Sequence, residues 1–200
     1  MLLENANGDT VPVMLSFLMH LLTVVLSPDT DRLATALQKQ ASYYLDMDSA
    51  RSHVIAAKMA STDEISAELL LGLAYVESRY LPLATSRVEG EARKTGIPSW
   101  KSPPSDMHGP YFCGVTQADA RFSWGRCLEL RDIQEAYRTT ARELTIWRNH
   151  PLCRASDNRM QCALWGYGGG KPAIELKTST YPNRVMFRAT ALHRATSSSS

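Results

Sequence analysis

A single carboxylate at the end of an apolar run is the first feature of this sequence that could do chemistry. In the stretch "LLLGLAYVESRYLP" (69–82), Glu77 is the only acidic residue. Moving a carboxylate out of water costs on the order of several kcal/mol unless it is paired or protonated. Glu77 therefore either meets solvent where a helix ends or serves in proton transfer, because desolvation raises a carboxyl pKa toward the range of a general acid.

Three further short motifs follow Glu77–Ser78 along the chain: "GVTQ" (114–117), "LWGYGGG" (164–170) and "YPNRV" (181–185). In order and spacing the motifs resemble those of the lysozyme-like lytic transglycosylases of the soluble type, distant relatives of goose-type lysozymes. In that family a helix ends in Glu-Ser, and Gly-Leu-Met-Gln, Ala-Tyr-Asn-Ala-Gly and a Tyr before an apolar position follow. The resemblance covers about residues 61–192.

The resemblance implies a mainly α, lysozyme-like domain that cleaves peptidoglycan glycan strands. Glu77 would protonate the glycosidic oxygen between MurNAc and GlcNAc, then act as a base on the muramic acid's own 6-hydroxyl, which closes a 1,6-anhydro ring. Because this nucleophile is intramolecular, a second carboxylate is not needed, unlike in ordinary glycosidases. No metal or other cofactor is expected. A hydrolytic muramidase on the same scaffold and a catalytically weak wall-binding component remain the alternatives.

The resemblance also implies four substrate-binding positions. Ser78 is expected near the substrate N-acetyl group, and Gln117 at the floor of the sugar cleft. Tyr167 matches the Tyr of the Ala-Tyr-Asn-Ala-Gly motif, and Tyr181 matches a Tyr that lies near the acid and orients it. Each position also has an ordinary structural alternative: a hydroxyl at a helix end for Ser78, a capping amide for Gln117, a core side chain for Tyr167 and a Tyr-Pro turn for Tyr181.

The sequence departs from the family pattern at three places. Gly168 stands where the family has Asn, so one amide contact to substrate is missing or is supplied elsewhere. Thr116 replaces Met, which changes the packing against sugar. Residues 91–108 look like an insertion whose prolines and Trp100 predict an added wall of the sugar cleft.

The four cysteines, Cys113, Cys127, Cys153 and Cys162, lie in the second half of the chain and form no CxxC motif. Without zinc-site spacing, an even number of cysteines favours two disulfides and an oxidising compartment. Local closure favours Cys113 with Cys127 and Cys153 with Cys162. Four reduced, buried thiols are the alternative.

The apolar run "VPVMLSFLMHLLTVVL" (11–26) is too short for a comfortable membrane span and follows acidic instead of basic residues. It could be a core helix, a helix that docks on a virion or envelope protein, or an export or membrane segment. The missing basic residues favour a phage virion slightly over a bacterial envelope. The protein is therefore expected to be extracytoplasmic (periplasm or cell envelope) or carried in a phage virion.

Helical periodicity predicts helices over most of the remaining chain and no convincing strand. Ser61 and Glu64 have capping-box spacing, which predicts a helix start, and Gly72 predicts close approach of another backbone. Residues 82–114 break this pattern and predict a long loop with at most a short hairpin. We therefore expect a helical extension at 1–60, a lysozyme-like domain at 61–196 and a disordered tail at 197–200. The formal net charge of +2 gives no support for nucleic-acid binding.

Overall fold

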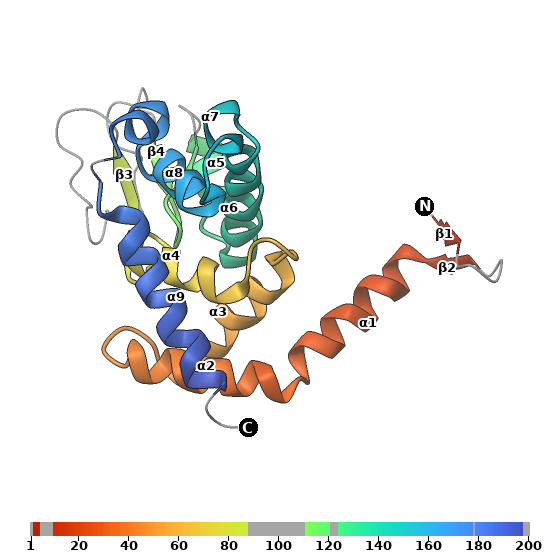
Figure 1. Ribbon diagram of the computed structural model, residues 1–200. Helices are drawn as coiled ribbons and strands as arrows, with labels where there is room; N and C mark the ends of the chain where they lie inside the picture. Colours follow the sequence, from red (N-terminus) through yellow and green to blue (C-terminus); the bar gives the residue numbers. More distant parts are fainter. Residues whose placement is uncertain (1, 5–9, 88–110, 121–123, 178, 198–200) are drawn as a thin grey trace.

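The computed structural model describes residues 2–4, 10–87, 111–120, 124–177 and 179–197. Helices dominate this part of the chain (Figure 1), which confirms the mainly α prediction. The helices are α1 (Val13–Val25), α2 (Pro28–Gln40), α3 (Met47–Ala60), α4 (Ala67–Ser78), α5 (Trp124–Glu129), α6 (Ile133–Arg148), α7 (Pro151–Arg154), α8 (Arg159–Leu176) and α9 (Tyr181–Ser197). The strands are β1 (Leu2–Glu4), β2 (Thr10–Pro12), β3 (Thr85–Arg87), β4 (Tyr111–Cys113) and β5 (Ala118–Asp119).

A serine caps the start of the helix that carries Glu77, but it is not the serine of the predicted capping box. The N-cap of α4 is Ser66, whose hydroxyl oxygen accepts a hydrogen bond from the backbone N–H of Leu69 at 3.2 Å. Ser61 instead follows the last turn of α3, and the chain between the two helices closes through the backbone pair Thr62–Ile65. The predicted capping box at Ser61 was therefore wrong, because a tight turn occupies the first part of the predicted helix.

Helix α4 lies at the centre of the core and is buried on nearly every side. Helix α9 crosses it closely, and Val185, Ala189 and Leu192 are buried against it. A Cβ atom built on Gly72 would lie 2.8 Å from the carbonyl oxygen of Val185. The close backbone approach predicted at Gly72 is confirmed, and a larger residue there would push α9 away.

One hydrophobic core extends across residue 60, where the sequence predicted a boundary. Leu37 of α2 and Val54 of α3 are fully buried in the same cluster as Leu73 of α4 and Leu192 of α9. Helices α2 and α3 therefore belong to the body of the protein and support α4 from one side (Figure 1).

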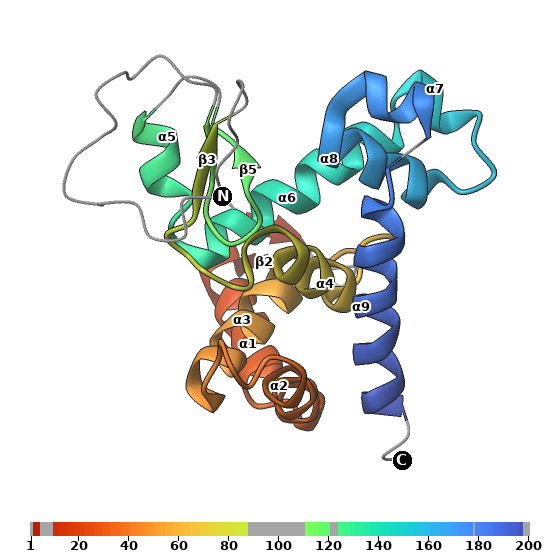
Figure 2. The same cartoon turned by 90° about the vertical axis from the view of Figure 1, so that its left-hand side faces the viewer.

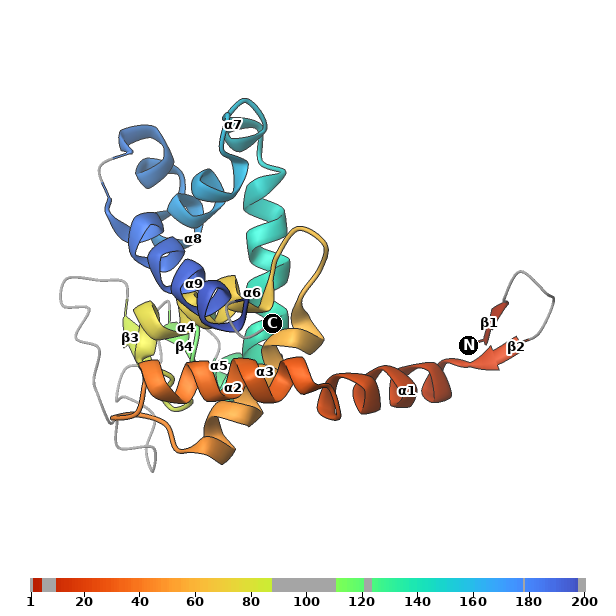
Figure 3. The same ribbon diagram turned by 60° about the horizontal axis from the view of Figure 1, so that its bottom comes forward.

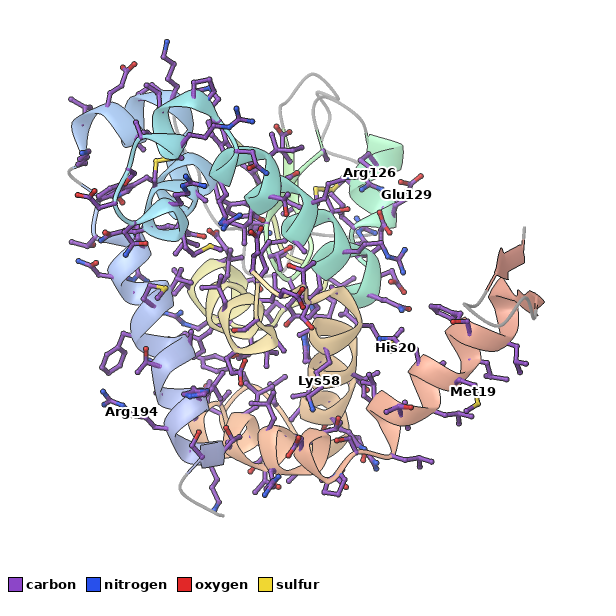
Figure 4. The ribbon with its side chains drawn as sticks, turned by 45° about the vertical axis from the view of Figure 1, so that its right-hand side comes forward. Met19, His20, Lys58, Arg126, Glu129 and Arg194 are labelled. Carbon is purple, nitrogen blue, oxygen red and sulfur yellow. A yellow bond between two sulfur atoms is a disulfide. The ribbon has the colours of Figure 1, made fainter. Side chains whose placement is uncertain are left out.

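Helix α1 extends away from the body as an arm (Figures 1 and 3). Phe17, Leu18 and Met19 are 50–59% exposed, and Figure 4 shows Met19 pointing away from the other helices. The core-helix alternative for residues 11–26 was therefore wrong, since among the side chains described for α1 only Leu21, Val24 and Val25 are partly buried and the others are exposed. Within the described residues, no helix is both long enough and apolar enough to cross a membrane.

A small antiparallel sheet forms part of the stretch predicted to be helical or irregular. Strand β4 pairs with β3 and β5, with Thr85 opposite Cys113 and Cys113 opposite Ala118. Helical structure resumes after the predicted loop only at Trp124, because the turn 114–117 and β5 occupy residues that were expected to be helical. The pairing of β3 with β4 agrees with the short hairpin predicted for 82–114, and the predicted insertion 91–108 lies outside the described residues.

Both predicted disulfides, Cys113–Cys127 and Cys153–Cys162, are present. The first joins β4 to α5. Helix α5 is further tied to α6 by Arg126, which pairs with Glu135 of α6 at 2.9 Å. Within α5, Arg126 also pairs with Glu129 at 2.7 Å (Figure 4).

The second disulfide joins α7 to the first turn of α8. In Figure 2 the sheet with α5 and the pair α7–α8 lie on opposite sides, and α6 runs from one to the other. Helix α8 is interrupted at Gly170, whose φ of 66° is not helical, so α8 has a kink there and continues to Leu176.

Candidate active site

Glu77 occupies the last turn of α4, where the chain leaves the helix abruptly. Arg79 and Tyr80 both adopt left-handed backbone conformations, with φ of 58° and 65°. This is costly for residues other than glycine, and it is held by the buried Tyr80, whose hydroxyl donates a hydrogen bond to the carbonyl of Leu71 at 3.1 Å. Glu77 is consequently half-buried at the edge of the core, neither fully exposed at the helix end nor enclosed in the core.

Tyr181, the first residue of α9, brings its hydroxyl to Glu77. Burial raises the pKa of Tyr181 well above its ordinary value, and the negative charge of Glu77 raises that pKa further. The hydroxyl oxygen is buried and makes no well-formed hydrogen bond with the described residues. It is therefore a neutral donor held beside Glu77, able to stabilise the carboxylate form. The prediction that Tyr181 lies near the acid agrees with this arrangement.

The ring of Tyr181 packs directly against Gly168 of α8. A Cβ atom at Gly168 would lie 2.8 Å from Cδ1 and 3.0 Å from Cγ of Tyr181, closer than real contacts allow. The ring thus packs on the bare backbone of α8. The Asn of the motif that this segment resembles would therefore compete with the Tyr181 ring for the same space.

The motif 114–117 forms a tight turn behind Glu77, not a helix. Gly114 has φ of 77°, and a Cβ atom there would lie 1.9 Å from the carbonyl oxygen of Leu130, so only glycine fits. Gln117 also has a left-handed φ, 52°. Its side-chain amide donates hydrogen bonds to the carbonyls of Ala84 at 2.9 Å and Gly114 at 3.0 Å.

Ser78 and Tyr167 attach this turn to the two neighbouring helices. The Ser78 hydroxyl donates to the carbonyl of Val115 at 2.6 Å and accepts from the backbone N–H of Leu81 at 3.1 Å. The Tyr167 hydroxyl, on α8, donates to the carbonyl of Thr116 at 2.7 Å. The end of α4, the turn and α8 are therefore connected directly behind Glu77.

The structure brings all five predicted site residues together, but with unequal access to a ligand. Ser78 and Gln117 are buried, as is the hydroxyl of Tyr167, and their polar atoms bond to backbone or neighbouring side chains. This geometry favours a positioning role for these three over direct contact with substrate. Thr116, the departure from Met, is fully buried and so does not face a cleft.

Glu143 on α6 is a site residue that the sequence analysis missed. Burial raises the pKa of Tyr167 well above its ordinary value, and the negative charges of Glu143 and then Glu77 raise that pKa further. Glu143 follows Thr140 by three residues, which puts the two on the same face of α6, and Thr140 contacts the Tyr167 hydroxyl at 3.2 Å. Helical spacing alone could place Glu143 beside Thr140, but nothing in the sequence says that this face meets Glu77.

Among the described residues, no group of three or more His, Cys, Asp or Glu side chains is arranged to hold a metal ion. The comparisons with family models, with curated proteins and with solved structures each gave no match.

Proposed function

We propose that this protein is a peptidoglycan lytic transglycosylase with a lysozyme-like fold, acting on the β-1,4 bond between MurNAc and GlcNAc. The observation that carries the proposal is the approach of the buried Tyr181 hydroxyl to the half-buried Glu77. The order of the motifs along the chain supports it. The turn 114–117, which is attached directly behind Glu77, also supports the proposal.

In this mechanism Glu77 begins protonated and donates its proton to the leaving glycosidic oxygen. The substrate N-acetyl group stabilises the anomeric carbon as the bond breaks. Glu77, now a carboxylate, removes the proton from the 6-hydroxyl of the same MurNAc, whose oxygen attacks the anomeric carbon and closes the 1,6-anhydro ring. Tyr181 donates toward the carboxylate during this second step, when the acid carries its negative charge.

A hydrolytic muramidase is the second candidate, and Glu143 is the observation that favours it. Two carboxylates near one cleft allow one to act as acid and the other to activate a water molecule. Glu143 and Glu77 both act electrostatically on the Tyr167 hydroxyl, so they share one neighbourhood. In a transglycosylase Glu143 is not needed for proton transfer, whereas in a hydrolase it is the base.

Product analysis with two variants tests both candidates. We expect Glu77→Gln to lose more than ~100-fold of the lytic activity on purified sacculi with an unchanged circular dichroism spectrum, because an amide cannot transfer the proton. Mass spectrometry should find 1,6-anhydro-MurNAc ends, and Glu143→Gln should retain most of the activity. Reducing MurNAc ends, one water heavier, together with inactive Glu143→Gln would establish the hydrolase. Activity of Glu77→Gln within a few-fold of the wild type would overturn the catalytic assignment.

The same proposal includes an extracytoplasmic setting, or carriage in a phage virion. The two disulfides support an oxidising compartment. The exposed apolar arm α1 supports a virion or envelope partner at residues 11–26, because an arm of this kind is unfavourable in water alone.

A further inference from the structure

Most of the exposed apolar residues of the arm α1 lie along one side of it. They are spaced i, i+3, i+4, i+7 and i+11, which places them on one face of a helix, and they form the α1 stripe: Leu15, Leu18, Met19, Leu22 and Leu26. Each of them is 45–73% exposed. Leu26 lies just beyond α1, but its backbone N–H still donates to the carbonyl of Leu22 at 2.9 Å, so the stripe continues to the end of the arm.

The polar residues of α1 lie on a different side of the helix from the α1 stripe. Ser16, His20 and Thr23 are spaced i, i+4 and i+7, and Figure 4 shows His20 and Met19 on different sides of the arm. The Thr23 hydroxyl donates to the carbonyl of Met19 at 2.8 Å. A helix surrounded by hydrocarbon is apolar all round, and one that lies on a lipid surface carries Lys or Arg on its polar face. The pattern of α1 instead favours packing against another helix.

The α1 stripe is suited to a second copy of itself because it carries no charge. Residues 11–26 contain no Asp, Glu, Lys or Arg. Two copies of a charged surface repel each other, whereas two copies of this stripe bring together only leucine and methionine side chains. In a twofold arrangement each stripe covers the other, so the contact closes on itself and leaves neither stripe in water.

The exposed area of the α1 stripe is close to what a specific contact between two chains needs. Roughly half-exposed leucine and methionine residues offer on the order of 100 Å² each, which gives about 500 Å² per chain. Two stripes together bury about 1,000 Å², the lower end of specific protein–protein interfaces. This area predicts a reversible pair and not an obligate one.

We infer that the protein forms a homodimer through α1, in which the two helices lie antiparallel with their α1 stripes in contact. Only the C-terminal end of α1 joins the body, and its N-terminal end projects away (Figures 1 and 3). The antiparallel arrangement therefore places the two bodies at opposite ends of the pair, with Leu15 of each chain near Leu26 of the other. It also sets the two helix dipoles in opposite directions. The inference goes beyond the proposed enzymatic activity and does not depend on it.

Sedimentation equilibrium of the full chain tests the pairing. Between about 1 and 300 µM we expect the mass to rise from 22.2 kDa toward twice that value, with a dissociation constant on the order of 1–100 µM. Raising the salt concentration should not weaken an apolar contact of this kind.

Leu18→Glu combined with Leu22→Glu should weaken the pairing at least ten-fold, because like charges would then meet across the contact. Ser16→Glu places a charge on the polar face of the same helix, so it is the matched control and should pair as the wild type does. All three positions are exposed, so thermal unfolding of the body should not change.

Chemical crosslinking tests the orientation of the two helices. The native cysteines are all in disulfides, so an introduced cysteine is the only free thiol of its chain. In an equal mixture of Leu15→Cys and Leu26→Cys chains, a short bis-maleimide should link unlike chains in preference to like ones. Links mainly between like chains would overturn the antiparallel arrangement.

Three other outcomes overturn the inference. The first is a monomer at every concentration, which leaves residues 11–26 to the proposed virion or envelope partner, or to a lipid surface if that monomer binds phosphatidylcholine vesicles. The second is pairing that survives the two glutamates, which places the contact elsewhere on the chain. The third is assembly that grows beyond the dimer with concentration, because a closed twofold contact stops at two copies. None of these results bears on the transglycosylase proposal, which is tested by the products of cutting.

Discussion

At the scale of single residues, the candidate site depends on one contact between a glycine and a ring. Tyr181 can place its hydroxyl beside Glu77 only because Gly168 offers a bare backbone for the ring to lie on. A side chain at residue 168 would move the ring, and a displacement of about 1 Å of a positioning group can lower a catalytic rate by on the order of 100-fold.

Gly168→Ala should therefore lower lytic activity by ~10- to 100-fold. The overpacking costs about 1–3 kcal/mol of unfolding free energy, which the better helix propensity of alanine offsets by about 1 kcal/mol. Urea unfolding and sacculus lysis measure the two effects. In a Tyr181→Ala background, the same Gly168→Ala change should be neutral or stabilising. A loss of stability as large there as in the wild type would mean that the strain arises from another neighbour.

At the scale of elements, the two disulfides stabilise different parts of the molecule, although they close loops of similar length. Cys113–Cys127 holds β4, and the turn 114–117 behind Glu77 begins at the next residue. Cys153–Cys162 holds α7 against α8, away from that turn. Their sequence separations are 14 and 9 residues, so loop-closure entropy predicts comparable stabilisation.

Replacing both Cys113 and Cys127 by Ala should lower the unfolding free energy by ~2–4 kcal/mol and should also lower lytic activity under conditions where the protein remains folded. The paired Cys153→Ala and Cys162→Ala variant should lose a similar amount of stability and retain most of its activity. Chemical denaturation and lysis assays on protein from an oxidising compartment check both. Equal loss of activity in the two pairs would show that general loosening, not the turn, is responsible.

At the scale of the whole molecule, the elements around the site meet at one buried imidazole. His53 of α3 lies with Nδ1 3.0 Å from the hydroxyl of Tyr137 on α6, and its ring packs edge-on against Tyr80, which fixes the exit of the chain from α4. Burial lowers the pKa of His53 from 6.5 to about 4. The folded protein thus keeps this side chain neutral at a pH where the unfolded chain would protonate it.

Stability should consequently fall on acidification. Between pH 6.5 and about 4 the unfolded state binds a proton at His53 that the folded state does not. The stabilisation linked to His53 is therefore complete above pH 6.5 and is lost as the pH approaches 4, by up to about 3 kcal/mol. Unfolding of the wild type and His53→Gln between pH 7 and 4 measures it, since carboxylates elsewhere affect both alike. The variant should show the weaker pH dependence, and identical slopes would contradict the prediction.

The sequence alone determined the features set by local chemistry and by order along the chain. Helical spacing predicted a mainly α protein, Gly72 predicted a close helix crossing, and the short separations of the cysteines predicted the pairs that form. The same local evidence failed at the start of α4, where two capping serines are available within a few residues and only packing selects Ser66 over Ser61.

Only the tertiary structure decided which residues meet. Apolar composition could not tell that α4 is buried all round while α1 is exposed, because that depends on how many partners surround each helix. Glu143 joins the site, and Arg79, Arg184 and Arg188 share one pocket, through contacts among helices far apart in the chain. Spacing within a helix determines which residues share a face, but the face that meets another helix is set by the packing of the whole core.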